Sequence, residues 1–200
     1  MNTNSLIRGL LAALLVVATA GCNTFHPKLD YTKTSVPGIK PHPMQANLVL
    51  PQGLSDYKIV TKLHSGSEAY EFPVGKLLYQ YAQDVAKDCF QSVQLSAEHS
   101  TPSSGLVLSM KLIKASHVMP LFHDQEMTFV VEWTATDSAS GKTILLTTVK
   151  GGATATMRGF NLGSGAAKCI QLALADLYKN TAAALAGSSA IEQIATTGQQ

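Results

Sequence analysis

The sequence predicts an α+β fold: a two-layer sandwich in which two amphipathic helices pack on one face of a mainly antiparallel sheet with a three-strand meander. Apolar and polar residues alternate over three long consecutive segments, 106–118, 127–137 and 142–157, which is the period of half-buried strands. Apolar residues recur at steps of three and four in one segment before these strands and in one after them. One sheet face and two helix stripes can then bury each other.

The chain begins with the features of a secretory signal peptide. Its first eight residues carry one cation, Arg8, and no acid, and about a dozen apolar or small residues follow. That run is shorter than the roughly 20 residues that a membrane-spanning helix needs. Residues 1–21 are therefore expected to be removed.

The residues that end this run resemble a known processing motif. Thr19-Ala20-Gly21-Cys22 resembles the lipobox of bacterial lipoproteins, although that family usually has leucine where this chain has Thr19. The resemblance implies that Cys22 carries the lipid and becomes the first residue, and that several acyl chains hold it stably in a membrane. Asn23 follows, and by resemblance the lack of an aspartate there favours the outer membrane, with the domain facing the periplasm. The alternative is a cleaved, secreted protein in which Cys22 is an ordinary cysteine.

Residues 22–45 read as a lipidated, proline-rich tether with little periodicity. Phe25, Tyr31 and Ile39 offer apolar contacts through which the tether could order against the domain. The domain itself is expected to span residues 46–187, and it starts with two short strands, at 46–50 and 56–63.

The first helix is predicted within residues 72–90. Pro73 suits its first turn. Its apolar stripe is Val74, Leu78, Tyr81, Ala82, Val85 and Cys89. A strand at 90–95, a polar loop and then the meander follow, with a turn at 137–142.

The last helix is predicted to start at Ser164 or Gly165 and to stop at Gly187. Its apolar face is Ile170, Leu174, Leu177, Tyr178, Thr181 and Leu185, in which Thr181 is the weak member. Residues 188–200 read as a polar, frayed tail.

Composition excludes one class of partner. The formal net charge is +2 and charged residues make up 14% of the chain, against about 25% in typical domains. The chain has no basic run, and nucleic-acid binding needs clustered Lys and Arg. Membrane, protein or lipid partners therefore fit better than nucleic acid.

Motifs of catalysis or cofactor binding are missing from the sequence. Residues 159–165 resemble a phosphate-binding loop only in their glycines, because the Gly-Lys-Ser/Thr ending of such a loop is lacking. His117 and His123, with Asp124 and Glu126 nearby, could in principle hold zinc, but surface-loop histidines are the simpler account. We therefore expect no catalytic residues, no metal and no cofactor, and we interpret the chain as non-enzymatic.

Two further features leave alternatives open. Cys89 and Cys169 would meet in a disulfide if the two helices ran antiparallel over the sheet, and otherwise they are two small buried side chains. Met119-Pro120-Leu121-Phe122 puts apolar residues at a loop tip, which suggests a docking point for a partner or a lipid. The alternative is that this segment folds over the core.

The order of elements behind the lipobox resembles the small outer-membrane lipoproteins of Gram-negative envelope machinery. This group includes the lipopolysaccharide-assembly lipoprotein and the auxiliary lipoproteins of ABC-type lipid transporters. The likeness rests on residues 75–77, the meander at 106–157 and the helix from Ser164. It implies a protein that binds a protein or lipid component of an envelope assembly. The alternative function is a carrier that holds a lipid or small apolar ligand between helices and sheet.

Overall fold

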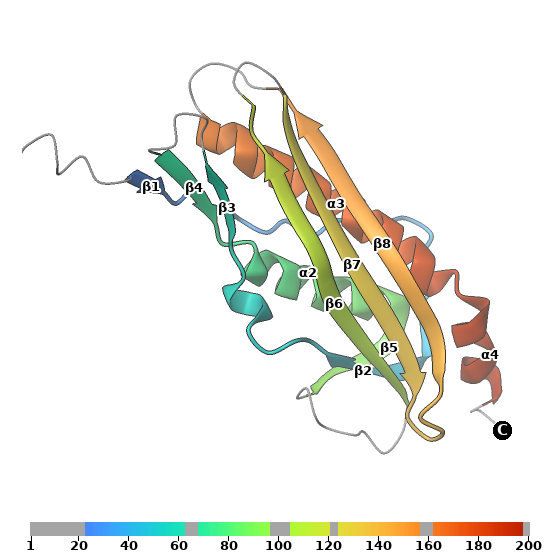
Figure 1. The fold of residues 1–200 in the computed structure, drawn as a ribbon. Helices are drawn as coiled ribbons and strands as arrows, with labels where there is room; N and C mark the ends of the chain where they lie inside the picture. Colours follow the sequence, from blue (N-terminus) through green and yellow to red (C-terminus); the bar gives the residue numbers. More distant parts are fainter. Residues whose placement is uncertain (1–22, 63–67, 97–104, 121–123, 157–161, 198–200) are drawn as a thin grey trace, which may run out of the picture.

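The computed structural model describes residues 23–62, 68–96, 105–120, 124–156 and 162–197 of the 200-residue chain. The strands are β1 (Asn23–Phe25), β2 (His42–Val49), β3 (Ile59–Lys62), β4 (Glu68–Phe72), β5 (Phe90–Ser96), β6 (Leu106–Val118), β7 (Gln125–Asp137) and β8 (Thr143–Ala155). The helices are the 3-10 turn η1 (Leu54–Asp56), α2 (Gly75–Cys89), α3 (Leu162–Ala186) and α4 (Ser189–Thr197). The described residues therefore have the predicted α+β class (Figure 1).

The predicted meander is confirmed. β6, β7 and β8 form consecutive antiparallel pairs, with Met110 opposite Trp133 and Val131 opposite Val149. In β7 every second residue from Gln125 to Ala135 is buried, because one face of the sheet is covered by helices and the other is not.

The rest of the main sheet differs from the mainly antiparallel arrangement that we expected. Its strand order is β5-β2-β6-β7-β8, and β2 runs parallel to both of its neighbours. The connection from β2 to β5 includes helix α2, and a crossover of this kind returns the chain in the same direction. The sheet is therefore mixed, with a parallel half and an antiparallel half.

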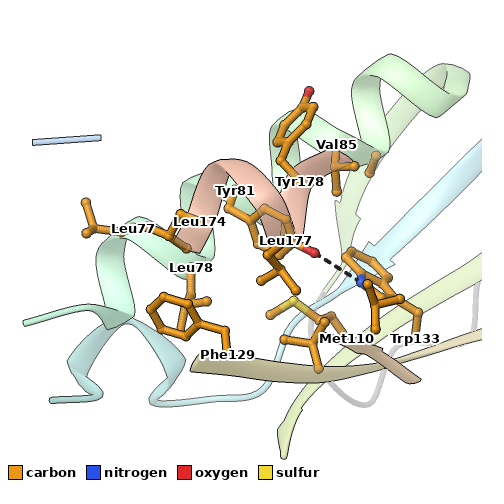
Figure 2. Packing of buried hydrophobic residues seen from close by; sticks show 14 of the residues in the cluster. Leu77, Leu78, Tyr81, Val85, Met110, Phe129, Trp133, Leu174, Leu177 and Tyr178 are labelled. Carbon is orange, nitrogen blue, oxygen red and sulfur yellow. Dashed lines mark hydrogen bonds between the residues drawn. The ribbon is translucent and has the colours of Figure 1, made fainter. Parts of the chain in front are cut away.

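The helices bury their apolar stripes against this sheet and against each other. α3 lies along β7 and β8, and α2 packs against α3, β2 and β5 (Figure 1). Figure 2 shows Tyr81 of α2 between Tyr178 of α3 and Trp133 of β7. The Trp133 indole N–H donates to the Tyr81 hydroxyl at 3.4 Å, and that hydroxyl also lies 2.5 Å from the Thr181 hydroxyl. Thr181 belongs to the apolar stripe because its one polar atom has a buried partner.

A second, smaller sheet was not expected. Its order is β1-β4-β3, in which β1 is parallel to β4 and β4 is antiparallel to β3. It takes up the first described residues of the segment that was expected to be a tether. Further along that segment, partly buried side chains pack against the core: Leu29, Tyr31, Val36 and Ile39.

The C-terminal segment also differs from the expected frayed tail. Residues 189–197 form helix α4, in which Ile191 and Ala195 are buried. These two residues are four apart, so one helical face carries both of them onto the domain. In the described part of the chain, no helix combines the length and apolar character needed to cross a bilayer.

Candidate functional site

The segment that follows Cys22 is held on the domain from its first described residues. β1 pairs with β4 immediately after Cys22, and the rings of Phe25 and Tyr70 stack with their centroids 5.2 Å apart. Further along, Gln171 of α3 donates from Nε2 to the Asp30 carbonyl oxygen at 3.1 Å. Contacts at both places fix the path of this segment across α3.

A charged and aromatic cluster holds the same segment to α2. Lys33 Nζ lies 2.7 Å from Asp88 Oδ1, and the Tyr178 hydroxyl donates to Asp88 Oδ2 at 2.5 Å. Burial raises the pKa of Tyr178 above its usual range, and the neighbouring Asp88 carboxylate raises it further. Burial and the neighbouring Asp84 carboxylate do the same to the pKa of Tyr31. Both phenols therefore stay protonated at physiological pH. The cluster has a structural role, because it holds the segment around Tyr31 and Lys33 against α2.

Residues 25–28 of this segment form one wall of a groove. The groove has a volume of about 750 Å³ and lies between residues 25–28, β4 and the first turns of α3. Its lining residues are Phe25, His26, Pro27, Lys28, Tyr70, Gly163, Ser164, Ala167, Lys168 and Gln171.

Two smaller hollows adjoin this groove around one residue. A hollow of about 570 Å³ shares Ser164 and Lys168 with the groove, and one of about 280 Å³ shares Lys168 and Gln171 with it. Leu172 lines both smaller hollows and is 44% exposed. Lys168 is therefore the centre of a recessed surface along the N-terminal half of α3. We call this surface the α3 groove.

The α3 groove combines positive charge with exposed apolar side chains. His26 Nδ1 lies 3.5 Å from Glu71 Oε1, and Lys28 Nζ lies 3.5 Å from Asp30 Oδ1, whereas no described acidic side chain pairs with Lys168. Phe25 is 42% exposed. Such a surface can bind a group that has an apolar part and a negative charge.

The predicted docking loop is only partly described. Met119 is 8% exposed and belongs to the interior, and Pro120 is half-buried. Leu121 and Phe122 lie outside the described residues. For Met119, the alternative of a segment folded over the core fits the structure.

The histidines considered for a metal site do not meet in the described part of the chain. His117 is buried between the two sheets, where its Nδ1 lies 3.1 Å from the Thr61 hydroxyl and its Nε2 lies 3.3 Å from Gln125 Oε1. Burial lowers the pKa of His117 below its usual value. His123 lies outside the described residues, and no three described metal-binding side chains stand together.

The disulfide considered from the sequence does not form, because the structure keeps Cys89 and Cys169 apart. Both are free and buried. Cys89 Sγ lies 3.9 Å from the carbonyl oxygen of Ala182, which is thirteen residues beyond Cys169 in α3. Thirteen residues of helix span about 20 Å, far beyond the reach of a disulfide. α2 and α3 run in the same general direction (Figure 1), so the end of α2 lies beside the second half of α3 and not beside its start.

No family model matches the chain, and no curated protein matches its sequence. The chain is similar in structure to protein XCC0632 from Xanthomonas campestris, which is described as belonging to the family model DUF330. The TM-score is 0.52 and the sequence identity is 11%, over 89% of this chain and 97% of that one. The two proteins share a fold. A minor lipoprotein from Acinetobacter baumannii has a TM-score of 0.42 and 12% identity over 72% of this chain and 90% of that one. A candidate lipoprotein from Caulobacter crescentus has a TM-score of 0.41 and 12% identity over 78% and 92%. At TM-scores below 0.5, these last two likenesses support no conclusion about this chain.

The sequence patterns did not predict the α3 groove. One signal was available: Lys168 and Leu172 are four apart in the last helix and lie off its apolar stripe, so they share an outward face. The other walls come from residues 25–28 and from Tyr70, which are far away in the sequence. Only the pairing of β1 with β4 brings them to α3.

Proposed function

We propose that this chain is a non-enzymatic lipoprotein of the bacterial envelope, anchored in the outer membrane through Cys22 and facing the periplasm. We propose further that its α3 groove binds a protein or lipid component of an envelope assembly, as the resemblance to small outer-membrane lipoproteins implies. One observation carries this proposal: β1 starts at the residue after Cys22, and Phe25 already lines the groove.

This short connection determines where the groove stands. Phe25 lies three residues beyond Cys22, and an extended chain of that length spans at most about 11 Å. A lipid on Cys22 would therefore hold the α3 groove next to the membrane surface. Confinement to one membrane raises the effective concentration of a partner there, so weak contacts suffice.

The packing of the core favours this reading over the carrier. Fully buried side chains fill the described space between helices and main sheet, among them Trp133, Tyr81, Tyr178 and Phe129 (Figure 2). A carrier could use the open α3 groove instead. Native mass spectrometry of protein purified in mild detergent would reveal a co-purifying lipid, and that result would favour the carrier.

Anchoring is tested by Cys22→Ser. The variant should leave the membrane fraction and collect in the soluble periplasmic fraction, because the proposed acylation site is lost. A variant that stays in the membrane fraction as firmly as the wild type would refute lipid anchoring through Cys22.

Recognition is tested by photo-crosslinking in intact cells. A photoreactive residue at Gln171 should give a discrete adduct, because this position lines the groove. The matched control is Ala139, an exposed position in the β7–β8 turn, which lies at the opposite end of the sheet from β1 (Figure 1). Adducts at Ala139 without adducts at Gln171 would contradict recognition by the groove.

A further inference from the structure

The charges that line the α3 groove are all of one sign. His26, Lys28 and Lys168 can each carry a positive charge, and none of the described lining residues is acidic. The first two have acidic partners that stand outside the groove, whereas Lys168 has none among the described residues. Residues 162–175 of α3 contain no Asp or Glu. The groove therefore presents one uncompensated cation at its centre.

Apolar side chains stand close to this cation. Phe25 is 42% exposed in the groove and stacks on Tyr70, with the ring centroids 5.2 Å apart. Leu172 is 44% exposed, lies four residues after Lys168 on α3 and lines both smaller hollows, which also contain Lys168. A ligand with its negative group at Lys168 can therefore lay an apolar part on either of these surfaces.

The position of the groove indicates where such a ligand comes from. Phe25 stands three residues beyond Cys22, so at most about 11 Å of chain separates it from the proposed lipid attachment. Phospholipid phosphates are concentrated at this height above a bilayer. Lysine is a common phosphate-binding residue and is depleted in the cores of protein–protein interfaces. A lipid headgroup therefore fits the groove better than a protein segment does.

We propose that the α3 groove holds the headgroup of an anionic phospholipid from the membrane in which Cys22 is anchored. This inference rests on the proposed function and names the occupant of its groove. The phosphate lies at Lys168, and the first carbons of the acyl chains lie along Phe25 before they enter the bilayer. A choline or ethanolamine headgroup would bring a second cation next to Lys168, so an anionic headgroup is preferred. The groove volume of about 750 Å³ lies within the usual range of about 300–1,000 Å³ for ligand pockets.

A bound headgroup gives the domain a second contact with the bilayer. The lipid on Cys22 fixes the location of the domain, and the headgroup in the α3 groove fixes its orientation. The bound phospholipid stays in the membrane, which distinguishes this contact from a carrier that extracts its ligand.

Calorimetric titration of the Cys22→Ser protein with short-chain lipids below their micelle concentration tests the ligand. Dihexanoyl phosphatidylglycerol should bind several-fold more tightly than dihexanoyl phosphatidylcholine and than inorganic phosphate. Equal binding of the two lipids would overturn the choice of an anionic headgroup. Phosphate that binds as tightly as phosphatidylglycerol would show that the apolar part is not recognised, and would overturn the proposal.

Lysine substitutions test the position of the headgroup. Lys168→Gln should weaken phosphatidylglycerol binding by about tenfold or more, which is the worth of one charge-assisted hydrogen bond. Its melting temperature should not change, because this side chain is exposed and has no described acidic partner. Lys142→Gln is the matched control, an exposed lysine in the β7–β8 turn at the other end of the sheet from β1 (Figure 1), and should bind as the wild type does. Equal losses in both variants, or no loss in Lys168→Gln, would overturn the proposal.

A steric substitution tests the groove itself. A Cβ atom added to Gly163 would meet Pro27 Cγ at 3.7 Å and Tyr70 Cε1 at 3.8 Å, which are ordinary contacts. Gly163→Ala should therefore bind phosphatidylglycerol nearly as the wild type does, whereas the longer side chain of Gly163→Leu fills the groove and should abolish binding. Full binding by a folded Gly163→Leu variant would place the headgroup elsewhere.

The photoreactive residue at Gln171 separates this inference from the proposed function. An adduct whose added mass is that of a phospholipid would support both. A protein adduct at Gln171, with no binding of phosphatidylglycerol, would overturn the phospholipid and leave recognition by the groove in place. If Gln171 forms adducts with neither lipid nor protein, recognition by the groove fails as well.

Discussion

The close approach of α3 to β8 gives the sharpest test of the packing described here. Gly151 lies on the covered face of β8, and a Cβ atom added to it would stand 2.4 Å from Leu177 Cβ and from the Leu177 backbone nitrogen. Ordinary contact begins at 3.4 Å, and because backbone atoms are involved, no side-chain rotation relieves the clash. Gly151→Ala must therefore push α3 away from the sheet by at least about 1 Å.

The expected cost follows from this displacement. Overpacking a core typically costs about 1–3 kcal/mol, and moving a helix backbone lies at the upper end, so we expect a loss of about 3 kcal/mol. For a domain of this size, that corresponds to a fall in Tm of about 6–12 °C. Gly152→Ala is the control. Its added Cβ would meet nothing closer than Met127 O at 3.6 Å, so a change within about 0.5 kcal/mol is expected.

Urea unfolding of the Cys22→Ser protein, followed by the fluorescence of Trp133, measures both variants. Trp133 is the single tryptophan and is fully buried, so its emission reports loss of the core. Equal midpoints for Gly151→Ala and Gly152→Ala would refute the argument, because the two substitutions differ only in the face of β8 on which the methyl group appears.

Three further predictions concern His117, Cys89 and Asp88. Because burial lowers the pKa of His117, the unfolded chain binds a proton more tightly than the folded chain does. The free energy of unfolding should therefore fall as the pH drops below about 6.5. His117→Gln should reduce this pH dependence, as measured by urea titrations between about pH 5 and 8. Burial raises the pKa of Cys89 to about 12, so a thiol reagent at about pH 8 should label the native Cys22→Ser protein very slowly. After unfolding, the same reagent should label two thiols. Fast labelling of the native protein would contradict this expectation. Asp88→Asn weakens the hydrogen bonds from Lys33 and Tyr178 and should lower the free energy of unfolding by about 1–2 kcal/mol. Trypsin should also cleave faster within residues 28–40. Unchanged cleavage would show that other contacts hold this segment on the domain.

The sequence predicted those elements whose period repeats many times. β6, β7 and β8 each run for 13 residues, and burial alternates along nearly the whole of β7. α2 spans 15 residues with one continuous stripe. At such lengths a strand pattern and a helix pattern cannot be confused. β4 and β1 have five and three residues, which is too short for a period to emerge. α4 offered only Ile191 and Ala195 as its buried pair.

The candidate site was less predictable for a physical reason. Its walls come from the residues just after Cys22, from Tyr70 and from the outward face of α3 around Lys168. The contact between the first two depends on backbone hydrogen bonds between β1 and β4, and backbone groups leave no trace in side-chain patterns. The apolar run at Met119 did carry a signal, but an apolar loop tip fits both docking and burial.

The position of β2 has a consequence for how the chain matures. β2 precedes both of its neighbours in the sequence, and its partners begin only at Phe90 and Leu106. A strand that appears early and must wait for two late partners raises the contact order and slows folding. Until β6 is complete, the nascent polypeptide carries an interior strand that lacks at least one of its two neighbours, a form prone to aggregation. A holding chaperone would be of most use during that interval.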